Sequence, residues 1–465
     1  MTHDAPIWSH LELMKRNQQP EFPLSPGMVT PARLPLGRRL QQSLRRAPSQ
    51  IAQAVRRPDP ADIEASNSYL LVSELFWAAI LSSMVAFGGN LAVRLGATTA
   101  MMGILSSVPS LIVVILTLPA ARWVESSHNR LKLMFASLTA ARCVFLLIAL
   151  MPFFVPRSHQ AIAFVILALS MQLVLPPFNA GWTALVSELV PERQRITVIS
   201  RRQIINSAVL VVLTPLVGKA LDLIVFPYGY QIAYFLGFIA GMLSMRELYK
   251  MRLPPDVESR PPAPKERLTL SLVRQMLGNN HNYMRFVFNT LMFDMGAWMI
   301  GPLYILRYLR ELGATDSWVG TLTAVANASV VIGATFWPKF IRRWGNYRTL
   351  RRTAPAICIY PLVASFAPVL WPLLVAAVAD GILAAGINLS HFNSLLQTCP
   401  AERKPTFISL YSVIMNAGAF IMPLIGVALA DRIGITPVLI IGGTMRFLGG
   451  LGFTLRPVVV KEQTG

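Results

Sequence analysis

Three acidic residues, Glu74, Asp294 and Asp380, lie inside long apolar stretches of the chain. A charged side chain in such a stretch is costly unless it faces a water-filled cavity or a partner. A carboxyl group kept away from bulk water can take up and release a proton near neutral pH. We therefore expect these residues to face a polar cavity, with Glu74 and Asp294 as candidate proton carriers. The alternative is that each makes a structural polar contact or reaches a polar rim.

A second polar stripe begins at Asp380 and continues to His391, with Asn388 and Asn393 nearby. Eleven residues at about 100° each return to within about 20°, so the acid and the histidine share one helix face, about 16 Å apart. Such a stripe can bind a polar ligand or relay a proton. The alternative for His391 is a packing or interfacial role.

Aromatic and amide side chains accompany these acids. Trp298 follows Asp294 by four residues and therefore lies above it on the same helix face. An aromatic ring beside a carboxylate suits an organic ligand that is cationic or amphipathic. The alternative is an aromatic side chain that faces lipid or the core. Three further candidates for the same cavity are Trp77, Asn179 and Trp182.

The apolar stretches themselves define the fold class. Of the 465 residues, 54% are hydrophobic and 14% charged, whereas about a quarter is charged in ordinary soluble domains. Apolar runs of roughly 18 to 25 residues recur about a dozen times, and each can cross a bilayer as a helix. The sequence predicts an all-α membrane protein with twelve transmembrane helices at about 69–92, 99–121, 133–154, 160–186, 203–223, 230–248, 285–307, 317–338, 354–370, 372–396, 407–430 and 436–455.

The net charge of +20 follows from the distribution of Lys and Arg. Most of them lie in the termini and in alternate loops, which predicts that both termini are cytoplasmic and argues against nucleic-acid binding. Residues 1–66 read as a disordered basic tail that anionic lipid can attract; a short surface helix around Leu36, Leu40 and Leu44 is the alternative. Because residues 1–20 are polar, we expect no cleavable signal peptide, and we expect the first span to direct insertion.

No motif for catalysis or for a cofactor is found. The cysteines Cys143, Cys358 and Cys399 form no CxxC pair, and the six histidines lack the spacing of two ligands on one helix face. A phosphate-binding GxxxxGK[ST] loop and a Ser/His/Asp set are also missing from the sequence. We expect neither an enzyme nor a cofactor.

The chain repeats itself. Leu95-Gly96-Ala97-Thr98 recurs as Leu312-Gly313-Ala314-Thr315, a shift that also pairs Gly103 with Gly320 and places Glu74 one helical turn from Asp294. Two parallel six-helix repeats are the architecture of one large transporter class. The predicted domains are two pseudo-symmetric six-helix bundles, 67–248 and 285–457, with a cytoplasmic linker, 249–284, and a C-terminal tail, 458–465.

Two duplicated loop patterns carry a resemblance to the major facilitator superfamily. After the second span, Glu125 and Arg130 match the acid and the last base of the family loop. The equivalent loop of the second half keeps Arg343 and Gly345 but has Arg342 where an acid is expected. After the fourth and tenth spans, the chain reads Glu188-x-x-Pro191-x-x-x-Arg195 and Gln397-x-x-Pro400-x-x-x-Lys404. In the family such loops contact the other half and gate the cytoplasmic side.

The resemblance implies a secondary transporter that moves a small organic solute by alternating access in the plasma membrane, as a monomer, with proton coupling as an option. It places the spans of Glu74, Asn179, Asp294 and Asp380 around the central cavity. Spans 3 and 12 are peripheral, so we expect Arg142 and Arg446 to pair within their own halves, Arg142 with Glu74. The alternative function is that of a transport-inactive relative acting as a receptor, sensor or assembly factor. The sequence does not identify the substrate.

Overall fold

A computed structural model describes residues 62–252, 280–400 and 404–455, and every regular element in these ranges is a helix. Most of the predicted tail and linker, and the whole predicted C-terminal tail, lie outside the described residues. The N-terminal half contains α3 (Ile63–Val85), α4 (Gly88–Arg94), α5 (Thr99–Ser126), α6 (Arg130–Phe154), η1 (Arg157–His159), α7 (Gln160–Val174), α8 (Pro176–Leu189), α9 (Glu192–Leu223) and α10 (Tyr228–Tyr249).

The C-terminal half repeats this order. It contains α13 (His281–Leu306), the π-turn η2 (Arg307–Glu311), α14 (Asp316–Trp344), α15 (Asn346–Ala356), α16 (Ile359–Phe366), α17 (Trp371–Thr398), α18 (Lys404–Ile433) and α19 (Ile435–Leu455).

Three of the predicted spans are broken helices. The first consists of α3 and α4, the fourth of α7 and α8, and the ninth of α15 and α16. The break in the fourth span falls at Pro176 and Pro177, where a helix loses backbone donors. Counted with these joins, the described residues contain helices for six passes in each half, and nine of the twelve spans are long and apolar enough by length and composition to cross a membrane.

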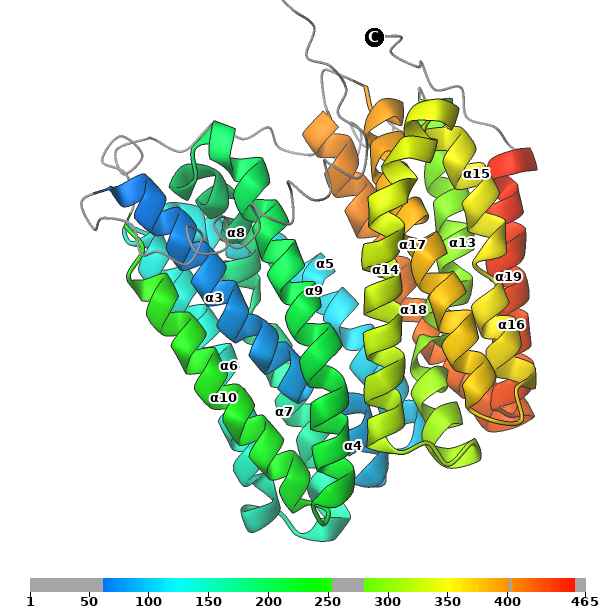
Figure 1. The fold of residues 1–465 in the computed structure, drawn as a ribbon, viewed down its shortest axis with the longest axis horizontal. Coiled ribbons are helices and arrows are strands. Elements are labelled where there is room, and N and C mark those ends of the chain that lie inside the picture. The colour runs from blue at the N-terminus through cyan, green and yellow to red at the C-terminus, as the bar shows by residue number, and fades with distance from the viewer. Residues whose placement is uncertain (1–61, 253–279, 401–403, 456–465) are drawn as a thin grey trace, which may run out of the picture. The chain divides into compact units, whose positions relative to one another are not determined.

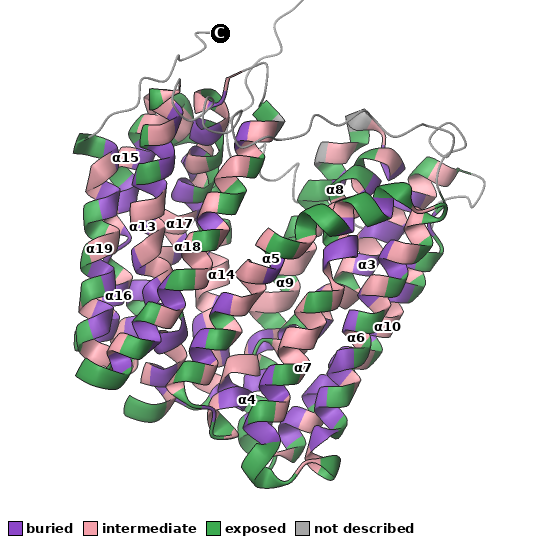
Figure 2. Ribbon diagram, turned by 180° about the vertical axis from the view of Figure 1, so that it is seen from behind, coloured by how far each residue is buried: buried purple, intermediate pink, exposed green. Residues whose placement is uncertain are grey.

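Each half of the bundle has apolar residues both in its interior and on its outer surface. Buried residues lie inside each half, and exposed ones follow the outward sides of the helices (Figure 2). Among the exposed residues are large apolar side chains such as Phe154 and Leu223, which are 80% and 76% exposed. An apolar outer surface of this kind is suited to contact with lipid.

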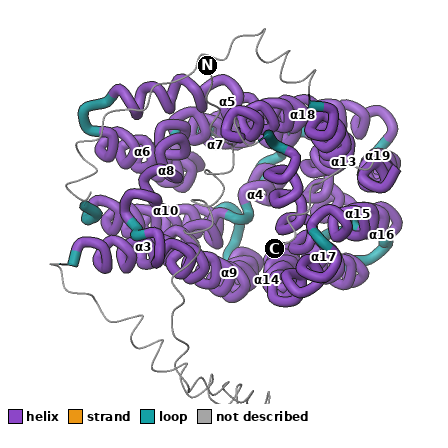
Figure 3. Tube along the Cα trace, turned by 90° about the horizontal axis from the view of Figure 1, so that it is seen from above, coloured by secondary structure: helices purple, strands orange, loops and turns teal. Residues whose placement is uncertain are grey.

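The halves meet along two pairs of helices. Figure 3 shows α5 beside α18 and α9 beside α14. The approach is close because small residues lie at the crossings: a Cβ atom on Gly103 would be 2.6 Å from Val427, and one on Gly320 would be 2.7 Å from the carbonyl oxygen of Thr214. Small residues let two helix backbones approach in this way.

The two ends of the bundle differ in how the halves pack. We call the end with the α4–α5, α9–α10 and η2–α14 connections the far end, and the end with the α5–α6, α8–α9 and α14–α15 connections the basic end. At the far end a single core contains Phe87 and Leu221 from the N-terminal half and Leu303 and Val427 from the C-terminal half.

At the basic end each half has a core of its own. One is built around Leu71 and Leu189, and the other around Phe286 and Phe407. In Figure 1 the ribbons of the two halves separate in the same direction, toward the end at which α3 begins. The halves are therefore joined at the far end and packed separately at the basic end.

Candidate functional site: a far-end latch and two charged clusters

The strongest polar contact between the halves is centred on Asp316, the first residue of α14, which is 1% exposed. Its carboxylate forms an ion pair with Arg94 at 2.9 Å. It also accepts hydrogen bonds from the Asn90 amide at 2.6 Å and from the Tyr230 hydroxyl at 2.7 Å. All three partners belong to the N-terminal half, on α4 and α10, so one buried carboxylate ties the halves together.

A second carboxylate, which belongs to the N-terminal half, accepts hydrogen bonds from the C-terminal half. Asp222, at the end of α9, accepts hydrogen bonds from the backbone N–H groups of Asp316 and Ser317 at 2.9 and 2.8 Å. An acid at a helix N-terminus satisfies free donors and suits the positive end of the helix dipole. We call the set Asn90, Arg94, Asp222, Tyr230 and Asp316 the far-end latch.

One further contact lies near the latch. Arg310 in η2 donates a hydrogen bond to the carbonyl oxygen of Ala97 at 2.5 Å. Ala97 belongs to the first copy of the repeated Leu-Gly-Ala-Thr segment, and Arg310 precedes the second copy. The repeated segments thus face each other across the halves at the far end.

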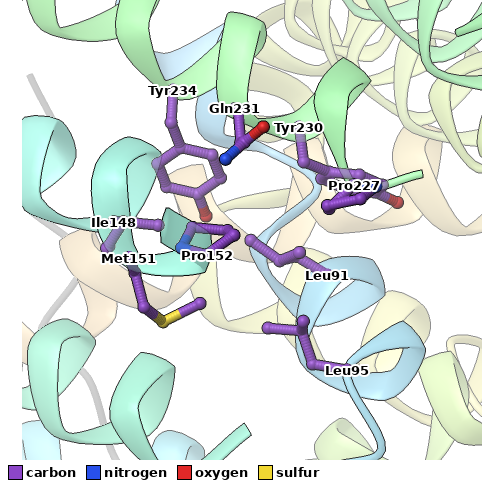
Figure 4. A pocket seen from close by; sticks show the side chains of 9 residues that line it. All are labelled: Leu91, Leu95, Ile148, Met151, Pro152, Pro227, Tyr230, Gln231 and Tyr234. Carbon is purple, nitrogen blue, oxygen red and sulfur yellow. The ribbon is translucent and has the colours of Figure 1, made fainter. Parts of the chain in front are cut away.

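Two cavities adjoin the latch, and neither is lined by Glu74, Asp294 or Asp380. One, of about 230 Å³, is lined by the latch residues Arg94, Asp222, Tyr230 and Asp316 and by the segment 223–226 with Leu221. The other, of about 10 Å³, has room for about one water molecule. Figure 4 shows its mostly apolar lining: Leu91, Leu95, Ile148, Met151, Pro152, Pro227, Tyr230, Gln231 and Tyr234.

Glu74 lies in a polar cluster within the N-terminal half and is 4% exposed. It forms an ion pair with Arg202 of α9 at 2.9 Å and accepts a hydrogen bond from Ser244 of α10 at 3.0 Å. The guanidinium of Arg202 also donates to the carbonyl oxygen of Leu71 and lies 5.2 Å from the centre of the Trp182 ring. The predicted site residues Glu74 and Trp182 are therefore brought together by an arginine that the sequence analysis did not single out.

The predicted pairing of Arg142 with Glu74 is an electrostatic interaction and not a close ion pair. Arg202 forms the ion pair, and Arg142 interacts with Glu74 only at longer range. Arg142 packs against α10, where a Cβ atom on Gly241 would be 3.1 Å from its Cδ. Its Nε is buried and has no hydrogen-bond partner among the described residues.

Asp294 and Asp380 belong to a cluster within the C-terminal half. Arg446 of α19 interacts electrostatically with both carboxylates. Its guanidinium lies 5.1 Å from the centre of the Phe293 ring, as expected for an arginine packed inside its own half. Within the part of the chain that the structure describes, neither acid forms a hydrogen bond or a close ion pair, and the buried Arg446 Nε and Tyr304 hydroxyl lack hydrogen-bond partners.

His391 is tied into the C-terminal half. Its Nε2 lies 3.0 Å from the hydroxyl of Thr290 on α13, and its ring packs against Phe286 and Tyr411. Asp380 interacts electrostatically with Tyr304 of α13 and Tyr308 of η2. His391 therefore faces α13 and has the packing environment given as its alternative.

The remaining cavity candidates are dispersed. Trp298 packs on α18, where a Cβ atom on Gly418 would be 2.7 Å from its ring. Trp77 packs edge-on against Phe76 and borders the far-end core. Asn179 and Asn388 are exposed.

The predicted gate loops form contacts within the N-terminal half. Arg130 donates two hydrogen bonds to the carboxylate of Glu188, at 3.1 and 2.7 Å. Arg195 donates to the carbonyl oxygens of Ser187 and Val190 and so caps the end of α8. The described contacts of these residues join α6, α8 and α9 rather than the two halves.

The equivalent loops of the C-terminal half are more open. Gly345 has a φ of +81°, which few residues other than glycine adopt, and it allows α15 to begin directly after α14. Arg343 and Lys404 are exposed, as is Glu125 in the N-terminal copy.

A sequence-family comparison decides which proteins the chain is related to. A family model described as "Major Facilitator Superfamily" matches residues 69–288 and 286–465. The chain belongs to the major facilitator superfamily. Among curated relatives, "Multidrug resistance protein MdtG" of Proteus mirabilis (strain HI4320) is 30% identical over 167 residues, which is 35% of this chain and 41% of that protein. The chain therefore matches about two fifths of the length of these relatives.

Solved structures of the superfamily share the fold. One is described as a bacterial homologue of the iron transporter ferroportin in an inward-facing state; it matches with a TM-score of 0.67 and 11% identity over 86% of this chain and 99% of its own. A D-xylose-proton symporter matches with a TM-score of 0.64 and 12% identity over 85% and 98%. At these identities the likeness concerns the fold alone, and it confirms the predicted major facilitator architecture.

The most important residue that was not predicted from the sequence is Asp316, which joins the two halves. A signal was present, because Leu95-Gly96-Ala97-Thr98 is followed by Thr99 whereas its repeat is followed by Asp316. An acid that appears in one copy of a repeated loop indicates a role specific to that half. Asn90, near the end of the first span, also belongs to the latch.

Proposed function

We propose that this protein is a secondary active transporter that moves a small organic solute by rocking its two halves about a central site. The far-end latch is the observation that carries the proposal. A buried carboxylate with three partners from the other half closes one end of the bundle, while the cores of the halves are separate at the opposite end. A closed gate at one end only is the arrangement that alternating access requires.

With the predicted topology, the basic end is cytoplasmic and the latch closes the outer side. The structure then corresponds to the state in which the central site faces the cytoplasm. The opposite state requires the latch to break and the loops at the basic end to meet. Arg343 and Lys404 are exposed at that end, where they are accessible for such contacts.

For proton coupling we favour Asp294 over Glu74. The two acids lie on equivalent helices, but Glu74 is compensated by Arg202 and Ser244. Asp294 shares the single guanidinium of Arg446 with Asp380, so the cluster has one more acid than base. A proton on one acid would balance the cluster, and its release would leave an uncompensated charge.

For the substrate we propose an amphipathic organic cation. Trp298 lies one turn from Asp294 on α13, so an apolar ring is close to a carboxylate that lacks a close ion pair. The name of the matched relative, a multidrug resistance protein, agrees with a substrate of this class.

Flux into proteoliposomes tests the proposal, with radiolabelled tetraphenylphosphonium as the probe and an imposed proton gradient. We expect saturable, gradient-dependent flux in wild-type protein. In Asp294→Asn the flux should no longer depend on the proton gradient. Glu74→Gln should retain gradient dependence. Flux that remains fully gradient-dependent in a protein carrying both substitutions would exclude both acids as proton carriers. A ligand that raises the melting temperature without any flux would favour the transport-inactive alternative.

A further inference from the structure

A dense group of cations lies where α14 ends and α15 begins, at the basic end. The segment 338–356 contains six basic residues and no acid. Five of them are exposed, and Arg351 is half-buried. We call this surface the α14–α15 corner and define it by Lys339, Arg342, Arg343, Arg348, Arg351 and Arg352, together with the aromatic residues Phe340 and Trp344.

The backbone brings these residues together. Gly345 ends α14 and α15 starts at the next residue, so the cations of the last turn of α14 lie beside those of the first turns of α15. The guanidinium of Arg352 lies 4.3 Å from the centre of the Trp344 ring, and that ring is 5.0 Å from Phe340, which is 39% exposed. The corner therefore combines cations with aromatic rings, and one of these rings belongs to a tryptophan, a residue enriched at membrane interfaces.

The cations of the corner are not compensated within the described part of the chain. None of the ion pairs or charged hydrogen bonds between described residues includes them. Arg348 and Arg352 are four residues apart on α15, a spacing at which like charges repel. Arg348 also lies in the first turn of α15, near the positive end of that helix dipole, whereas Arg342 and Arg343 lie in the last turn of α14, at the negative end of its dipole. An external anion would relieve both effects.

The equivalent corner of the N-terminal half shows the contrast. There an acid, Glu125, occupies the position that corresponds to Arg342. Arg130 of that corner is neutralised by two hydrogen bonds to Glu188. One copy of the loop thus compensates its charge internally, whereas the other presents it outward.

We propose that the α14–α15 corner binds the headgroup of an anionic phospholipid in the leaflet at the basic end. Arg342, Arg343 and Arg348 contact the phosphate, while Arg352 stays stacked on Trp344 at the level of the headgroups. Long basic side chains can reach the interface in this way while their stems lie along apolar surface. Cations near an anionic leaflet are attracted within about a Debye length, so the contact weakens at high salt. The inference rests on the membrane location of the bundle and is independent of the proposed transport activity.

Tryptophan quenching tests this proposal in nanodiscs. Phosphatidylglycerol or phosphatidylcholine carrying bromine near the headgroup is included at the same fraction, and the Trp344 contribution is obtained by comparison with Trp344→Phe. We expect brominated phosphatidylglycerol to quench Trp344 more strongly than brominated phosphatidylcholine. The preference should fall about fivefold for each arginine removed in Arg342→Gln/Arg343→Gln.

The matched control removes two cations from the equivalent corner, as Arg122→Gln/Lys132→Gln, and should keep the preference. Equal quenching by the two lipids in wild-type protein would overturn the proposal, as would a preference unchanged in Arg342→Gln/Arg343→Gln. If Arg342→Gln/Arg343→Gln does not fold, a salt titration of wild-type protein replaces it. Quenching by brominated phosphatidylglycerol that is insensitive to salt would then overturn the proposal. Displacement of the lipid by an added acidic peptide without any phosphatidylglycerol preference would assign the corner to a protein partner instead.

Discussion

Asp316→Asn should open the far end of the bundle. The substitution keeps the size of the side chain but removes the charge that pairs with Arg94 and replaces one acceptor oxygen by a donor. The bonds from Asn90 and Tyr230 use Oδ1, which an asparagine can retain, whereas the Arg94 contact uses Oδ2. The loss is therefore mainly that of one charge-assisted contact.

The size of the effect follows from burial. Hydrogen bonds to charged groups contribute about 1.5–3 kcal/mol, and Arg94, which is 36% exposed, can regain part of this from water. We therefore expect Asp316→Asn to destabilise the far-end-closed state by about 2 kcal/mol. This free energy shifts the ratio of far-end-open to far-end-closed molecules by about 30-fold. An open population of about 1% in wild-type protein would rise to about a quarter.

Distances between spin labels across the far end measure this shift. Suitable positions are the exposed Ser158 in the N-terminal half and Pro368 in the C-terminal half, in a protein whose native cysteines have been replaced. Asp316→Asn should add a longer distance component. The matched control, Glu247→Gln, breaks an ion pair with Lys250 inside one half and should leave the distances unchanged. Identical distance distributions in wild-type protein and Asp316→Asn would refute the latch.

Three further outcomes are expected. Gly320→Ala should favour the far-end-open state in the same distance measurement, because the new Cβ would lie 2.7 Å from a carbonyl oxygen of α9, whereas Gly301→Ala, with open space around it, should not. Arg202→Ala should lower the free energy of unfolding by about 3–5 kcal/mol because it leaves the buried Glu74 charge unpaired, and adding Glu74→Gln should restore most of the thermal stability. Burial raises the pKa of the Cys399 thiol to about 11, against a smaller lowering by Lys404, so its thiolate is scarce at pH 8. Its alkylation by iodoacetamide, followed by mass spectrometry, should rise about tenfold per pH unit up to pH 10; a rate that levels off near pH 9 would contradict the shift.

How much of the candidate site could be predicted from the sequence depends on the range of the interactions. Arg130 and Glu188 were both predicted in gate loops, and the structure joins them with two hydrogen bonds. Glu74 and Asp294 were predicted as a matched pair, yet only Glu74 has a close ion pair in the described residues. Their helix positions are equivalent, and the difference comes from neighbouring helices.

The sequence by itself determined that the fold is all-α and approximately where the helices lie. Hydrophobic runs, the prolines that break the fourth span and the repeat at Leu95 and Leu312 are local features of the chain, and lipid leaves helices as the way to satisfy the backbone. Tertiary structure alone decided which charges meet. Asn90 and Asp316 are 226 residues apart and Glu74 and Arg202 are 128 apart. Contacts at such separations depend on how helices pack, rotate and tilt against each other, and no local pattern in the chain encodes them.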